Sequence, residues 1–167
     1  MKKLFFSLLV LIGVLSSNHL AAQAHFSTEI GELVNGNAVI TYDMDTLKAE
    51  LAAFLSSQSS ISVTFSSATI ELDSNHYLLV ASNATNTIKT AVGLVRDGNS
   101  FYQEDTTSSI GGKSSCTCSP CNYGCSPQKL GNGEWNCKPC SESYDPPREC
   151  NKSETASGVA IFGGGGH

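Results

Sequence analysis

The stretch that decides the fold runs from Asp43 to Leu72 and reads DMDTLKAELAAFLSSQSSISVTFSSATIEL. Its first half predicts a helix from Asp45 to about Ser57, with Asp43 or Asp45 capping the first amide groups. The expected buried stripe of this helix is Met44, Leu47, Leu51, Phe54 and Leu55. From Ile61 onward, apolar and polar residues alternate, which is typical of half-buried strands. The change of period indicates an α+β fold.

Short strands separated by turn residues are expected on both sides of this stretch. Before it, Asn35-Gly36 lies between two apolar runs and suits the positive φ angles of a type I′ hairpin turn. After it, polar turns are expected at 73–75, 83–86 and 97–99. Strands this closely spaced must pair antiparallel, because parallel neighbours need a long crossover. Residues 25–105 are therefore expected to form one α+β domain, in which a helix packs on an antiparallel β-meander. The layout of this domain resembles the cystatin-like architecture.

Residues 1–24 have the three parts of a cleavable secretory signal peptide. Lys2 and Lys3 supply positive charge, an apolar run follows, and Ala22-Gln23-Ala24 offers the small residues of a cleavage site. The apolar run is shorter than the roughly 20 residues that a membrane span needs. The protein is expected to be secreted or periplasmic, with no membrane span after signal cleavage.

The charge of the chain limits its partners. The formal charge is −5, and cleavage after Ala24 would leave 8 basic against 15 acidic residues, which is −7. Nucleic acids and anionic membranes would be repelled by such a protein. A protein or a surface ligand is the partner class that this balance leaves open.

All seven cysteines follow a polar linker predicted at 106–115. They are Cys116, Cys118, Cys121, Cys125, Cys137, Cys140 and Cys150. In an oxidising compartment they are expected to form disulfides that hold a small, loop-rich module at 116–150, and 151–167 is expected to be a flexible tail. An odd number leaves one thiol that stays free, pairs between chains or binds a metal, with Cys150 as the candidate.

Two alternatives remain open for the cysteines. Cys118, Cys121, Cys137 and Cys140 have zinc-ribbon spacing, which indicates zinc or another soft metal as the alternative cofactor. Each Cys-x-x-Cys pair could instead be a thiol redox pair. A low thiolate pKa usually needs a helix N-terminus, however, and the proline and glycine residues of this segment disfavour a helix.

Cleavage after Ala24 would also make His25 the first residue, whose amine and ring nitrogens can chelate copper. Together with His76, this resembles the histidine brace of copper-dependent polysaccharide monooxygenases. The resemblance covers two residues and implies a copper redox enzyme. His76 also fits a simple turn position beside Asp73.

The sequence has no nucleophile elbow, zinc-protease motif or phosphate-binding glycine loop. It therefore favours an exported, non-enzymatic binding or interaction protein without a cofactor. A zinc- or copper-binding protein is the alternative, and a copper or thiol redox enzyme is a further one. Trp135, Tyr123 and Tyr144 are the sizeable apolar side chains of the cysteine-rich segment and the candidate partner-binding residues.

Overall fold

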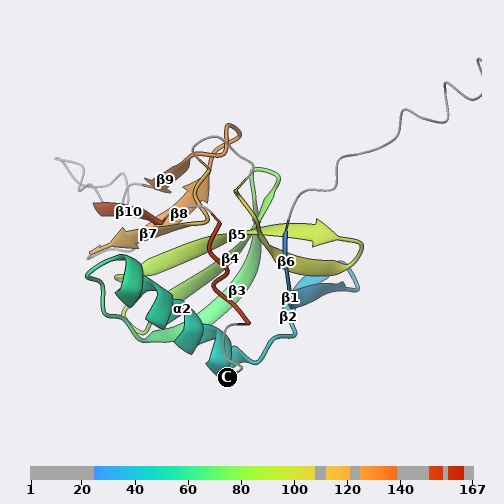
Figure 1. Cartoon of the computed structure of the whole chain (residues 1–167), viewed down its shortest axis with the longest axis horizontal. Coiled ribbons are helices and arrows are strands. Elements are labelled where there is room, and N and C mark those ends of the chain that lie inside the picture. The colour runs from blue at the N-terminus through green and yellow to red at the C-terminus, as the bar shows by residue number, and fades with distance from the viewer. Residues whose placement is uncertain (1–24, 108–111, 121–124, 139–150, 156–157, 164–167) are drawn as a thin grey trace, which may run out of the picture.

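The computed structural model describes residues 25–107, 112–120, 125–138, 151–155 and 158–163. Over these ranges the chain forms one helix and a largely antiparallel sheet (Figure 1), which confirms the predicted combination of a helix with antiparallel strands. The elements are β1 (His25–Val34), β2 (Asn37–Ile40), α2 (Met44–Gln58), β3 (Phe65–Asp73), β4 (His76–Asn83), β5 (Lys89–Asp97), β6 (Ser100–Glu104), β7 (Ser115–Ser119), β8 (Ser126–Lys129), β9 (Trp135–Lys138) and β10 (Asn151–Thr155). None of the helical structure in these ranges has the length and hydropathy to span a bilayer.

Helix α2 begins at the predicted cap. The carboxylate of Asp43 accepts hydrogen bonds from the hydroxyl of Thr46 at 2.6 Å and from its backbone amide at 2.9 Å. These bonds stabilise the charged carboxylate and lower the pKa of Asp43 from its ordinary value. Four of the five predicted stripe residues are buried, and Met44, the first residue of the helix, is exposed.

The predicted turns between strands are also present. Asn35 and Gly36 have φ angles of 51° and 82°, as a type I′ turn requires, and Ser74 and Asn75 between β3 and β4 also have positive φ. The alternating stretch that begins at Ile61 becomes a strand only from Phe65 onward. Local sequence therefore specifies most of the chain reversals in this half of the molecule.

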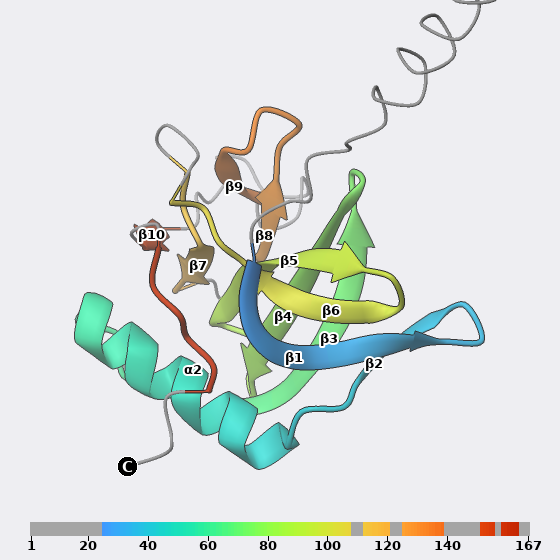
Figure 2. The same cartoon turned by 45° about the vertical axis from the view of Figure 1, so that its right-hand side comes forward.

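The sheet curls into a nearly closed barrel (Figure 2). Strands β2 and β3 contact each other at the closing edge, although no backbone ladder joins them within the described residues. A Cβ atom on Gly31 of β1 would lie 2.8 Å from the Cδ1 atom of Ile70 of β3, so glycine allows this close approach. The cystatin-like layout is not confirmed and stays a prediction.

Strand β5 is the branch point of the sheet. One of its edges pairs with β4, which in turn pairs with β3. The other edge is divided, because its Leu94–Asp97 half pairs with β6 and its Lys89–Val92 half pairs with β7. The sheet then continues from β6 to β1 and β2, and from β7 to β10. The first strand of the cysteine-rich segment therefore belongs to the same sheet as the predicted α+β domain.

The two faces of this sheet carry separate apolar clusters. Leu79 and Val92 face the cluster that includes helix α2, whereas their neighbours Leu78 and Ala91 face the opposite side. This alternation follows from the two-residue period of a strand. The second cluster, called here the sulfur cluster, is formed by Leu78, Ala91, Cys116, Cys118, Cys125 and Trp135, with Val80 and Cys137 packed against it.

Part of the predicted flexible tail is packed structure. Strand β10 pairs with β7, and residues 158–163 run alongside α2, on the face of the sheet that the helix covers (Figure 2). Ile161 and Phe162 are buried in the helix-side cluster. The buried side chain of Gln103 donates to the carbonyl of Val159 at 2.6 Å and accepts from the amide of Ile161 at 2.7 Å. Gln103 thus satisfies the backbone groups of a segment that is too short to form its own element.

Candidate functional site

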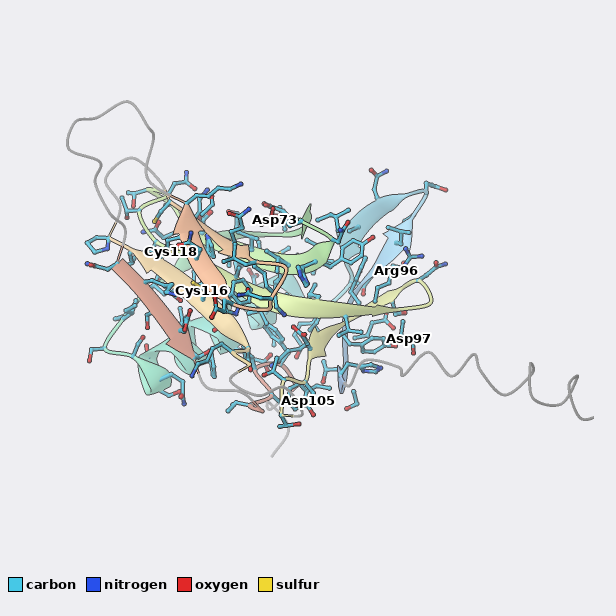
Figure 3. All side chains as sticks on the ribbon, turned by 90° about the horizontal axis from the view of Figure 1, so that it is seen from above. Asp73, Arg96, Asp97, Asp105, Cys116 and Cys118 are labelled. Atoms are coloured by element: carbon cyan, nitrogen blue, oxygen red, sulfur yellow. A yellow bond between two sulfur atoms is a disulfide. The ribbon has the colours of Figure 1, made fainter. Side chains whose placement is uncertain are left out.

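Three cysteine sulfur atoms meet beneath the hairpin of β8 and β9. Cys116 and Cys118 are two residues apart on β7 and therefore share a face, as Figure 3 shows. Cys137 of β9 forms a disulfide with Cys118, with Cα atoms 5.8 Å apart. The Sγ atoms of all three lie within 4.8 Å of one another. The expected disulfide chemistry is confirmed for this pair.

The thiols beside this disulfide are buried. Cys116 and Cys125 are free thiols. Burial raises the pKa of Cys116 to about 12, with a further contribution from the charge of Glu154, and burial raises the pKa of Cys125 to about 11. Thiol–disulfide exchange requires a thiolate, so a thiol that stays protonated at neutral pH attacks slowly. This environment favours a structural staple over a redox pair.

The predicted zinc set is only partly described. Cys118 and Cys137 are bonded to each other, so their sulfur atoms are not free thiolates in this form. Cys121, Cys140 and Cys150 lie outside the described residues, as do Tyr123 and Tyr144. Sequence reasoning did not place Cys116 beside the disulfide, although its i, i+2 spacing from Cys118 within a strand was a usable signal.

Trp135 packs into the sulfur cluster and is only 2% exposed. Its indole N–H donates to the carbonyl of Lys113 at 3.0 Å, and its own carbonyl accepts from the ammonium of Lys152 at 2.9 Å. The hypothesis of an aromatic anchor for a partner needs Trp135 at the surface. Its observed place is that of a side chain packed over a disulfide.

The two candidate copper ligands have different surroundings. The ring of His25 stacks on Tyr102 with centroids 4.4 Å apart, and its Nε2 atom lies 4.0 Å from the carboxylate of Asp97. His76 begins β4 and lines a polar cavity. Three strand spacings separate β1 from β4 by way of β6 and β5, about 14 Å in a flat sheet. No contact in the described structure joins the two rings.

This polar cavity lies beside the branch point of the sheet and has a volume of about 240 Å³. Its lining residues are Asn75, His76, Tyr77, Leu94, Arg96, Glu104 and Lys129. The ammonium of Lys129 forms an ion pair with the carboxylate of Glu104, and the Lys129 side chain is 5% exposed. Both groups sit over Gly93, where a Cβ atom would lie 2.5 Å from the Glu104 carboxylate and 3.2 Å from the Lys129 ammonium.

The charges of the cavity leave a positive excess. Glu104 and Lys129 neutralise each other. Arg96 donates its Nε–H to the carbonyl of Gly98 at 2.7 Å, and within the described ranges it forms no ion pair. In the part of the chain that the structure describes, the ring of His76 likewise forms no hydrogen bond. The guanidinium and the imidazole are therefore available to a ligand. We call this site the basic cavity.

Sequence reasoning missed the basic cavity, because its charged residues come from β4, β5, β6 and β8 and share no local motif. Figure 3 shows Arg96 well away from Cys116 and Cys118. The cavity nevertheless adjoins the sulfur cluster, because the Lys129 ammonium lies over the ring of Trp135, 5.7 Å from its centroid. Comparison of the chain with protein-family models, with curated proteins and with solved structures finds no match.

Proposed function

We propose that this chain is an exported, non-enzymatic binding protein that holds a small anionic group in the basic cavity. The proposal rests on which charged groups of the cavity are already paired with each other and which are not. The one carboxylate in the lining is already paired with Lys129. Arg96 and His76 remain to bind an anion, in a protein whose overall charge is negative.

The size and donors of the cavity define the ligand class. A volume of about 240 Å³ is below the roughly 300–1,000 Å³ of pockets that enclose drug-sized molecules. It therefore suits one carboxylate or phosphate group of a ligand. The planar guanidinium of Arg96 can donate two parallel hydrogen bonds to either group.

The disulfide supports this site from a distance. Lys129 is the last residue of β8, and β8 is paired with β9, which carries Cys137. The Cys118–Cys137 bond ties this hairpin to the sheet. Closing a loop of this length stabilises a protein by about 3 kcal/mol in the chain-entropy model. The disulfide thus holds one wall of the cavity in place, which suits export into an oxidising compartment.

The test is a titration of the full chain with sodium phosphate and, separately, with sodium acetate, followed by NMR chemical shifts. Chemical-shift changes are expected at residues 76, 94, 96 and 104. The anion that binds more tightly shows whether the ligand carries a phosphate or a carboxylate group. Arg96→Gln is expected to weaken binding roughly tenfold to a hundredfold, as for the loss of hydrogen bonds to a charged group.

The matched control is Lys48→Gln, which removes the same charge at a different cavity, lined in part by Asp45 and Lys48 of α2. It should leave the affinity unchanged. Equal weakening in both variants would show a nonspecific charge effect. Failure of both anions to shift residues around His76 would refute the proposal.

A further inference from the structure

The sulfur cluster has a second chemical state that the basic cavity does not involve. In the disulfide form, one thiol, Cys116, lies beside a bonded pair, Cys118 and Cys137, with all three sulfur atoms within 4.8 Å. Three sulfur atoms that share one metal ion at about 2.3 Å each lie roughly 4 Å apart. The backbone of β7 and β9 therefore already brings three sulfur ligands together, and breaking the Cys118–Cys137 bond lets its two sulfur atoms move apart to this separation.

We propose that, after reduction of the Cys118–Cys137 disulfide, Cys116, Cys118 and Cys137 bind one Cu(I) ion in a trigonal three-sulfur site. The disulfide form cannot bind the ion in this way, because two of the three sulfur atoms are bonded to each other. The oxidation state of this one bond thus decides whether the site exists.

The number and type of ligands favour Cu(I) over zinc. Structural zinc sites take four ligands, and among the described residues no fourth His, Cys, Asp or Glu side chain joins this group. Cys125 packs in the same sulfur cluster, but its sulfur is not part of the three-sulfur group. Soft thiolates select Cu(I), which accepts three-coordinate sites.

The reaction balances with a small dithiol as the reductant. The dithiol gives two electrons and two protons to the Cys118–Cys137 bond, which becomes two thiols, and the dithiol itself becomes a disulfide. Binding of Cu(I) then releases the three thiol protons to water and forms three copper–sulfur bonds. Cys116 and Cys118 are fully buried, whereas Cys137 is half-buried, so the reductant and the ion reach the cluster from the side of Cys137.

One cation and one anion act on this site from β10. They are the ammonium of Lys152 and the carboxylate of Glu154, which lie on the strand paired with β7. The two groups are paired with each other at 2.8 Å. Lys152 also donates to the carbonyl of Trp135, which fixes its charge beside the cluster. Because Lys152 and Glu154 neutralise each other, this pair leaves the net charge of a bound Cu(I) tris-thiolate unchanged.

The experiment uses the full chain, reduced with dithiothreitol, freed of the reductant without oxygen and titrated with Cu(I) against a competing chelator. X-ray absorption is expected to show one copper bound by three sulfur atoms. Cys116→Ser should lower the affinity at least roughly tenfold and reduce the sulfur count, whereas the matched variant Cys125→Ser should change neither. The oxidised protein should not form the three-sulfur site.

A mapping experiment keeps the test independent of how the variants fold. The reduced wild-type protein is alkylated under unfolding conditions, with and without Cu(I), and analysed by mass spectrometry. Cu(I) should protect Cys116, Cys118 and Cys137, whereas Cys125 should be alkylated equally in both samples. Protection confined to other cysteines, or a sulfur count unaffected by Cys116→Ser, would refute the proposal.

Discussion

The clearest stability prediction concerns Gln103, whose buried amide side chain holds residues 159–161 against the sheet. In Gln103→Ala, the carbonyl of Val159 and the amide of Ile161 lose their partners. Each buried, unsatisfied polar group costs about 1–3 kcal/mol. The segment can instead detach and regain water, but it then exposes Ile161 and Phe162, at about 1.5–3 kcal/mol for each side chain.

The smaller of these two costs sets the expected effect. The first route begins at about 2 kcal/mol and the second at about 3 kcal/mol, so Gln103→Ala should lower the free energy of unfolding by about 2–4 kcal/mol. Because small proteins are stable by only about 5–15 kcal/mol, urea unfolding followed by Trp135 fluorescence will resolve this change. Hydrogen exchange at the Ile161 amide should accelerate in the same variant.

The control is Gln58→Ala, which removes the same side chain from an exposed position at the end of α2. It should change the free energy of unfolding by less than about 0.5 kcal/mol. If Gln103→Ala is equally neutral and the Ile161 amide keeps its protection, then Gln103 does not hold this segment and the reasoning fails.

Two further predictions test the cavity floor and the helix cap. Gly93→Ala places a methyl group 2.5 Å from the Glu104 carboxylate. It should lower the free energy of unfolding by about 1–3 kcal/mol, measured by urea unfolding. The control is Gly131→Ala, whose methyl group meets no atom within 4 Å and should leave the stability unchanged. The lowered pKa of Asp43 means that its carboxylate stabilises the fold above the ordinary value of 3.8 and loses this effect as the pH falls through the lower folded value. Asp43→Ala should therefore lower the melting temperature at neutral pH and approach wild type in strong acid; a constant difference across this range would contradict the assignment.

Much of the first half of the chain could be predicted from sequence, because its signals are local. Asp43 and the spacing of Leu47, Leu51 and Leu55 define one helix, and Asn35-Gly36 defines one turn. In each case the decisive residues lie within one helix or one hairpin, so the sequence pattern and the physical contacts involve the same short segment.

The second half could not be predicted in the same way, because its contacts join distant segments. Nothing near Gln103 indicates that it bonds to residues 159–161. Arg96, Glu104 and Lys129 meet only because β5 is shared by several strands. The pairing of Cys118 with Cys137 was one of many that the spacing allowed, and the choice depends on where β9 crosses β7.

The divided edge of β5 also bears on aggregation. If the chain were cleaved between β6 and β7 and the later part lost, the Lys89–Val92 half of β5 would become an open edge with unpaired backbone groups. The apolar side chains of Leu78 and Ala91 would be uncovered beside it. Such an edge recruits strands from other molecules. The cysteine-rich segment thus shields this edge of the sheet, and proteolysis within residues 105–114 would turn it into a template for assembly.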